Sequence, residues 1–150
     1  MNIVVLNRSD WIDERKVCLV DRRADHIRSV LRAAVGDSIR VGELNGDLGQ
    51  GRICALDADA VVLEVDLNQP PPPRHRFDIV LALPRPKVLR RLFRTVAEYG
   101  VANLHLINCA RVEKSYWQSP LLAPEKVHDA LLAGMERASD TVAPRVHQHR

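Results

Sequence analysis

The sequence has no long hydrophobic run, and only 4% of its residues are aromatic. No stretch approaches the roughly 18 apolar residues of a membrane-spanning helix. The segment Met1–Trp11 lacks the basic start and the long apolar core of a signal peptide. These absences predict a cytoplasmic protein without a membrane partner. The three cysteines, Cys18, Cys54 and Cys109, are far apart. Their odd number favours small buried thiols in a reducing compartment over disulfides or metal ligands.

Motifs of the common cofactor enzymes are also missing. The seven glycines form no phosphate-binding loop and no dinucleotide fingerprint, and the sequence has no HExxH motif. No Ser/His/Asp or Cys/His set can be argued from spacing. His147 and His149 lie in a polar segment that is typical of a fraying terminus rather than a metal site. Spacing alone therefore identifies neither a catalytic residue nor a metal site.

Charge is distributed unevenly along the 150 residues. Residues 1–70 hold 9 basic and 12 acidic side chains, a net charge of −3, whereas residues 71–150 hold 13 and 7, a net charge of +6. The run Gln69–Pro73 stands where the sign changes, and consecutive prolines favour an extended linker. We expect two units, 1–68 and 76–150, joined by a linker at 69–75. Any polyanion contact is favoured on the second unit.

The first half has the pattern of a small β-barrel around one helix. Strands are predicted at 2–6, 16–20, 38–44, 51–56 and 60–65. Apolar residues at helical spacing predict a helix from Asp21, its N-cap, to about Ala34, with Gly36 as its C-cap. Asn45-Gly46 predicts a tight turn with positive φ at both central positions. We expect the helix to carry its arginines largely on the exposed side: Arg22, Arg23, Arg28 and Arg32.

The second half has an α/β pattern. Residues 77–83 form a continuous apolar run, typical of a strand covered on both faces. A helix over 88–99, a strand at 102–108, a loop at 109–123 and a helix from Pro124 to about Ala138 follow, and 144–150 begin a third strand. Two parallel strands and two helices bury little surface. We therefore expect that this chain is a fragment, or that another chain covers the open edge of the sheet in its second half.

Two basic segments begin at the carboxyl ends of the predicted parallel strands, where open α/β sheets place ligand sites. The first, Leu83–Arg94, enters a helix and suits phosphate oxygens. Its cations are Arg85, Lys87, Arg90, Arg91 and Arg94. The alternative for this segment is a solvated basic helix face.

The second basic segment, Asn108–Ser119, interleaves Arg111 and Lys114 with Tyr116 and Trp117. Stacking rings beside cations suit single-stranded RNA. The alternative is a loop pinned by one buried aromatic residue. Glu113 is the only acid in this segment, and we expect it to form a salt bridge with Arg111 or Lys114.

The whole chain resembles the RsmE family, the methyltransferases that act on N3 of a uridine in small-subunit ribosomal RNA. The matching segments run in order along the sequence: Asp25–Arg32, Gly36-Asp37, Asn45-Gly46 with Gly49 and Gly51, Leu81–Lys87, Glu98–Val101 and Arg111–Gln118. The His-x-x-x-Val-Leu-Arg pattern at His26–Arg32 and the Ala-Leu-Pro-x-x-Lys pattern at Ala82–Lys87 are fairly specific together.

The resemblance implies a fold of class α+β then α/β: an N-terminal PUA-like small β-barrel, then an incomplete SPOUT domain whose family members carry a deep trefoil knot. It implies S-adenosylmethionine as the methyl donor, ribosomal RNA or the small ribosomal subunit as partner, a homodimer in the full-length family, and a role in ribosome biogenesis. The RNA-binding residues expected on this reading are Arg28, Arg32, Arg85, Lys87, Arg90, Arg111, Lys114, Tyr116 and Trp117.

Two departures from the family pattern stand out. The Gly-rich knot loop and the later Leu-Gly-x-x-Ile-Leu-Arg-type segment do not occur here, so we expect an incomplete, inactive fragment that binds no cofactor. In the segment Glu136–Thr141, an acid stands about where the family has an arginine near the reacting uridine. The alternatives are a non-catalytic RNA-binding module and a truncated product whose α/β half is not stable.

Overall fold

The computed structural model describes all residues from Met1 to Arg150. Contacts divide the chain into two compact units, Asn2–Pro71 and, grouped with Met1, Pro72–Arg150. None of the helices combines the length and the apolar character needed to cross a membrane.

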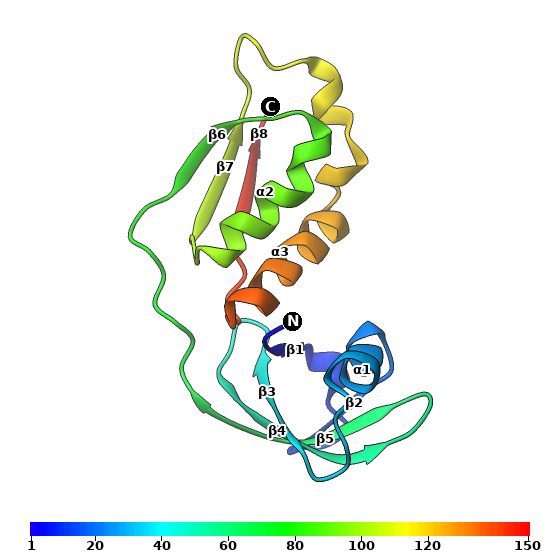
Figure 1. Ribbon diagram of the computed structural model, residues 1–150. Coiled ribbons are helices and arrows are strands. Elements are labelled where there is room, and N and C mark those ends of the chain that lie inside the picture. The colour runs from blue at the N-terminus through cyan, green and yellow to red at the C-terminus, as the bar shows by residue number, and fades with distance from the viewer. The chain divides into compact units, whose positions relative to one another are not determined.

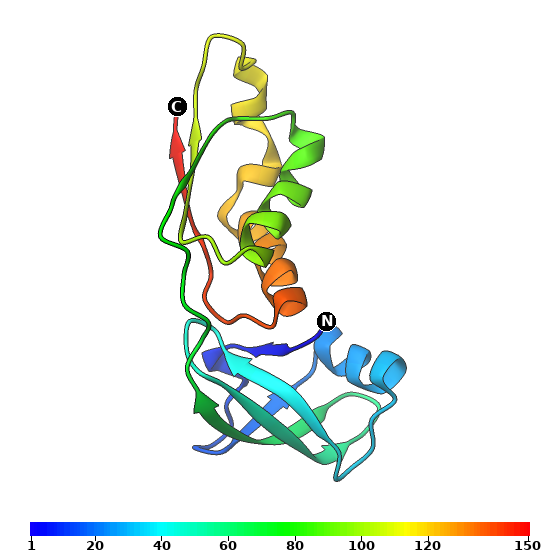
Figure 2. The ribbon, with the colours of Figure 1, turned by 60° about the vertical axis from the view of Figure 1, so that its left-hand side comes forward.

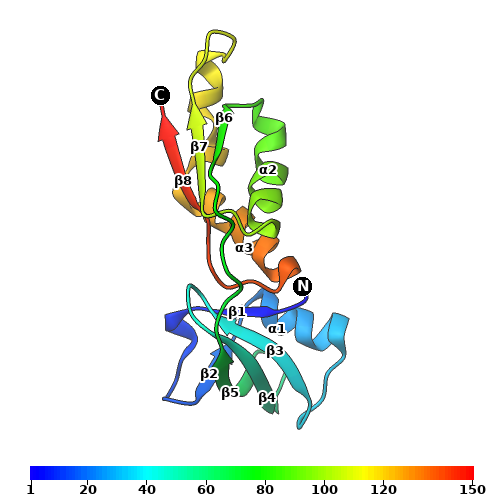
Figure 3. The ribbon, with the colours of Figure 1, turned by 90° about the vertical axis from the view of Figure 1, so that its left-hand side faces the viewer.

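The unit Asn2–Pro71 is built on one five-stranded sheet, curved into a half-barrel (Figure 3). Its strand order is β1-β3-β4-β5-β2, and all neighbours are antiparallel except β1 and β3. Because β1 and β2 remain at the two edges, the predicted barrel is not closed. The five predicted strands are confirmed as β1 (Val4–Leu6), β2 (Lys16–Leu19), β3 (Ser38–Glu43), β4 (Leu48–Leu56) and β5 (Val61–Gln69).

The predicted helix of this unit is shorter than its apolar pattern indicates. The α-helix α1 (Arg22–His26) widens into a π-turn, η2 (Ile27–Leu31), and ends at Arg32 with φ 52°. Within η2, the Ser29 hydroxyl donates to the Asp25 carbonyl at 2.6 Å, a local bond that competes with regular helix bonding. Val30 is consequently 63% exposed, and the predicted cap at Gly36 is wrong.

The turn between β3 and β4 also differs from its prediction. The Gly46 amide donates to the Glu43 carbonyl at 2.9 Å, so Leu44 and Asn45 are the central residues. Only Asn45 has positive φ, at 61°, and Gly46 does not. Asparagine tolerates the left-handed conformation, which is why this turn needs no glycine at that position.

Arg23 is the main polar group of this unit's core, and the expectation that it lies on the exposed side is wrong. It is 4% exposed. Its guanidinium donates to both carboxylate oxygens of Asp10, at 2.6 and 2.8 Å, to Asp21 at 2.8 Å and to the Val5 carbonyl at 2.8 Å. One side chain thus joins β1, the 3-10 turn η1 (Arg8–Asp10) and the start of α1.

The same contacts set the ionisation of Asp21. Partial burial alone raises the pKa of Asp21, but hydrogen bonds with Arg23 and the charges of Arg23 and Arg22 outweigh it, so the pKa is lowered. The carboxylate therefore stabilises the folded unit at pH values above the pKa of the unfolded chain. That stabilisation is lost as the pH falls through the folded-state pKa.

The unit Pro72–Arg150 has a three-stranded parallel sheet with the order β6-β7-β8. The strands are β6 (Ile79–Ala82), β7 (Asn103–Ile107) and β8 (Arg145–His149), and the helices are α2 (Pro86–Glu98) and α3 (Pro124–Ala138) (Figure 1). The predicted strand–helix–strand unit and the third strand are confirmed. The segment between β7 and α3 contains two 3-10 turns, η3 (Lys114–Gln118) and η4 (Pro120–Leu122).

Both helices lie on the same face of this sheet (Figure 2). Leu104 and Leu106 of β7 are fully buried under them. The helices approach closely at Gly134, where a Cβ atom would lie 2.3 Å from the Arg94 carbonyl oxygen. On the other face Val80 is 62% exposed, so the prediction that this strand is covered on both faces is wrong.

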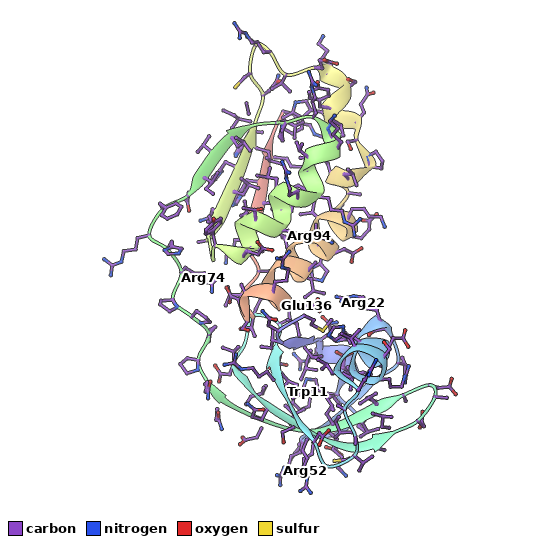
Figure 4. All side chains as sticks on the ribbon, in the orientation of Figure 1. Trp11, Arg22, Arg52, Arg74, Arg94 and Glu136 are labelled. Atoms are coloured by element: carbon purple, nitrogen blue, oxygen red, sulfur yellow. The ribbon has the colours of Figure 1, made fainter.

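The end of α3 is joined to the chain that enters β6. Arg74 forms an ion pair with Asp140 at 2.5 Å and donates to the Val142 carbonyl at 3.3 Å. Asp140 is 3% exposed and accepts from the Val142 amide at 3.0 Å. Asp140 is the acid that stands about where the family has an arginine. In this chain it is a buried partner of Arg74, which Figure 4 labels.

The three cysteines are free, but they are not the buried thiols that the sequence predicts. Cys18 is half-buried, and Cys54 and Cys109 are exposed. Cys54 lies on the solvent side of β4, where alternation along the strand places it opposite to the buried Ile53. Cys109 follows the end of β7 and lies outside the sheet.

Replacing Arg23 by methionine should destabilise the unit Asn2–Pro71 by about 3–5 kcal/mol, because it leaves the buried Asp10 carboxylate without its partner. Urea unfolding followed by circular dichroism measures this change. The matched control is Arg40→Met on the exposed side of β3, which should change stability by less than about 0.5 kcal/mol. Equal effects of the two substitutions would contradict this role of Arg23.

Candidate nucleic-acid interface

The carboxyl ends of β6, β7 and β8 meet at one edge of the parallel sheet. The Leu83 amide donates to the Ile107 carbonyl, and the Asn108 amide donates to the His149 carbonyl, each at 3.0 Å. These bonds extend the ladder just past the strands, so the three following segments begin side by side. We call this edge the carboxyl edge; it comprises residues 83–91, residues 108–118 and Arg150.

The first segment of the carboxyl edge leads into α2. Arg85 is the N-cap of this helix and provides no side-chain acceptor for the first turn, and Pro86 occupies the first helical position. Buried Leu89 and Phe93 fix the inner face of the helix. The cations on its outer side are exposed and have no acidic partner: Arg85, Lys87, Arg90 and Arg91.

Arg94 differs from the other four cations of this segment. It is half-buried, and its Nε atom is buried without a hydrogen-bond partner. Figure 4 labels it on α2. The structure therefore separates the predicted set of five into four exposed cations and one that is partly enclosed.

The second segment presents Trp117 at the carboxyl edge. The Trp117 Nε1–H group points to Asn108 Oδ1 at 3.4 Å, and the Arg150 guanidinium lies 5.9 Å from the centroid of the ring. Tyr116 and Trp117 are both half-buried, so neither is the fully buried aromatic residue of the alternative. Trp117 does pin the loop, through Asn108 after β7 and Arg150 after β8.

Glu113 has a different partner from the one expected. Its Oε1 atom accepts the Tyr116 hydroxyl hydrogen bond at 3.1 Å, and it forms no salt bridge with Arg111 or Lys114. Arg111 and Lys114 are exposed and without an acidic partner. Both cations are consequently available to an anionic ligand.

Arg28 and Arg32 belong to the other unit, Asn2–Pro71. Arg28 donates to Asp25 at 2.6 Å and to the Asp57 carbonyl at 3.0 Å. Hydrogen bonds from the Ala60 and Asp59 amides, followed by the charge of Arg28, lower the pKa of Asp57. Arg28 thus closes the turn between β4 and β5, whereas Arg32 is exposed.

Sequence reasoning missed two contributors to the carboxyl edge, Asn108 as the partner of Trp117 and Arg150 as the cation over its ring. Both follow strand ends, so the parallel register was the signal that could have identified them. His147 and His149 are not in a fraying terminus, because both belong to β8. No group of three or more His, Cys, Asp or Glu side chains is arranged to hold a metal ion.

A family model described as an RNA methyltransferase domain matches residues 70–150. The chain belongs to this RNA methyltransferase family. It is 32% identical over 148 residues to Ribosomal RNA small subunit methyltransferase E of Treponema pallidum (strain Nichols), covering 97% of this chain and 56% of that protein. The resemblance to the RsmE family is thereby confirmed.

Solved structures share the fold at lower identity. A predicted RNA methyltransferase from Thermotoga maritima matches with a TM-score of 0.71 and 17% identity, over 99% of this chain and 64% of that one. The Ribosomal RNA small subunit methyltransferase E from Neisseria gonorrhoeae, bound to S-adenosyl methionine, matches with a TM-score of 0.71 and 13% identity, over 99% of this chain and 62% of that one. The chain thus spans a little over half the length of its curated relative.

Proposed function

We propose that this chain is the RNA-holding part of a methyltransferase that uses S-adenosylmethionine to methylate N3 of a uridine in small-subunit ribosomal RNA. On this proposal the half-barrel unit is PUA-like and the parallel-sheet unit is the first part of a SPOUT domain. The observation that carries the proposal is the carboxyl edge, where exposed cations without acidic partners share one sheet edge with the half-buried Trp117. Membership of the RNA methyltransferase family supports it.

The chemistry of the carboxyl edge suits single-stranded RNA. Six exposed cations without acidic partners can neutralise phosphates: Arg85, Lys87, Arg90, Arg91, Arg111 and Lys114. Tyr116 and Trp117 offer rings on which unpaired bases can stack. Arg32, exposed on the half-barrel unit, is a further phosphate contact on this proposal, whereas Arg28 acts by holding its turn.

The carboxyl edge does not fit the methyl donor. S-adenosylmethionine carries a positive sulfonium beside the methyl group, and the side chains gathered at this edge are mainly cations. The only acid there, Glu113, is engaged by Tyr116. Glu113 is also the only acid at this edge that could remove the uracil N3 proton. Because the Tyr116 hydroxyl already engages it, we assign no catalytic base. We infer that parts of the longer relatives with no counterpart in these 150 residues hold the donor.

The proposed partners follow from this function. Ribosomal RNA or the small ribosomal subunit is the substrate, the cytoplasm is the compartment, and the complete enzyme is a homodimer. A second candidate function is a non-catalytic RNA-binding module. It is favoured by the same cations, because they require no cofactor to bind RNA.

Reversing two charges at once, Arg90→Glu with Arg91→Glu, should weaken binding of a single-stranded RNA oligonucleotide about tenfold and reduce the slope of log affinity against log salt by about 1 to 2. Fluorescence anisotropy at several salt concentrations measures both quantities. The reason is the loss of phosphate contacts, each of which releases counterions on binding.

The matched control reverses two exposed arginines of the same unit that lie before β6 and at the start of β8, Arg76→Glu with Arg145→Glu. The change in net charge is identical, but the positions lie away from the carboxyl edge. Equal losses in the two double variants would mean that net charge alone drives binding, and the proposed interface would then be wrong.

Titration of the 150-residue chain with S-adenosylmethionine should give no measurable heat of binding up to millimolar ligand. The cationic carboxyl edge opposes the sulfonium charge, and the chain has no other site proposed for the donor. Isothermal titration calorimetry measures this directly. Micromolar binding would overturn the inference that the donor site lies outside these residues.

A further inference from the structure

The uncovered face of the parallel sheet carries three histidines in contact with one another. His105 of β7 lies opposite His147 of β8 in the strand register, and His149 follows two residues later on the same face. The rings of His105 and His147 are 4.5 Å apart at their centroids and 11° from parallel. The rings of His105 and His149 are 5.3 Å apart and 21° from parallel.

His105 and His149 are joined ring to ring. His105 Nδ1 lies 3.0 Å from His149 Nε2, a hydrogen-bond distance. One of these nitrogens must donate and the other must accept. One hydrogen atom therefore lies between these two nitrogens. If both rings were fully protonated, two N–H groups would point at each other.

The proton on His147 is fixed by its neighbours. The Asn103 amide nitrogen donates to Asp78 at 2.9 Å, so the Asn103 oxygen faces His147 Nε2, at 3.1 Å, as an acceptor. His147 Nε2 consequently carries hydrogen. His147 stacks on His105, so a charge on one ring lies close to any charge on the other.

Two charged side chains share this face of the sheet with the histidines. Asp78, before β6, has its Oδ2 atom 3.9 Å from His105 Nε2. Arg145 lies opposite Asn103 at the start of β8. The helices α2 and α3 pack against the other face, so they add no charge here (Figure 2). One carboxylate can balance one protonated ring, whereas a second positive ring would have no counter-charge.

We propose that His105, His147 and His149 form a proton-sensitive latch, which keeps the end of β8 on the sheet while it carries at most one extra proton and releases that end when it takes up a second. The latch reaches the carboxyl edge directly. The His149 carbonyl accepts from the Asn108 amide, and the next residue, Arg150, lies over Trp117. Release of His149 therefore removes Arg150 from the Trp117 ring and loosens the contact between Asn108 and Trp117.

The latch is a property of the sheet and needs no RNA. If the carboxyl edge binds RNA as proposed above, acidification also changes the surroundings of the stacking ring. The pH range follows from ordinary histidine chemistry, in which imidazoles change charge between about pH 5 and 8.

Tryptophan fluorescence tests the latch without any RNA, so its failure and the failure of the RNA proposal are separate results. Trp11→Phe leaves Trp117 as the only tryptophan of the 150-residue chain. In that background the emission of Trp117 should change between about pH 7.5 and 5.5. His149→Gln should abolish most of this change, because it removes the ring that joins the end of β8 to His105. His128→Gln, on the exposed side of α3, should leave it unchanged.

Nuclear magnetic resonance of the unsubstituted chain provides a second measurement that depends on no variant. The backbone amide signals of His149 and Arg150 should change between about pH 7.5 and 5.5, because the end of β8 leaves the sheet over that range. The latch is overturned if the amide signals of His149 and Arg150 stay constant over that range, or if Trp117 responds equally to pH with and without His149.

Discussion

The parallel pairing of β7 with both of its neighbours is the constraint on which the proposed site depends. It brings the carboxyl ends of three strands to one edge, although the segments that follow them lie far apart in the sequence. The basic start of α2, the aromatic turn after Asn108 and Arg150 meet there for that reason. Neither basic segment alone distinguishes an RNA surface from an ordinary solvated face. Their convergence on the sheet edge that also carries Trp117, with no acid neutralising them, favours the RNA surface.

The one-sided arrangement of the helices has a second consequence. The helices α2 and α3 pack closely on each other at Gly134 and cover one face, so the other face is left to side chains of the strands. On that face β8 is held by imidazole and amide contacts rather than by apolar packing. Strand β8 therefore contributes histidine rings to the open face, and the residue that follows it, Arg150, is the cation beside Trp117 at the carboxyl edge.

Most elements could be predicted because apolar periodicity is local. The strands, the helix beginning at Pro124 and the position of the basic segments all follow from it. Arg23 could not be placed, because its burial depends on Asp10, thirteen residues earlier and in another element. The histidines of β8 were misassigned because their partner, His105, is forty-four residues away. For the site, the cations and aromatics could be identified from sequence, but Asn108 and Arg150 needed the strand register.

Residue-level mapping of RNA contact tests the central claim most directly. An isotopically labelled sample of the chain, titrated with a short single-stranded RNA, reports which backbone amides change their chemical shifts. The account predicts changes concentrated at residues 83–91 and 108–118, including the Trp117 indole signal, with residues 76–78 and 143–146 unaffected. Changes confined to Asn2–Pro71, or spread evenly over every basic residue, would contradict it.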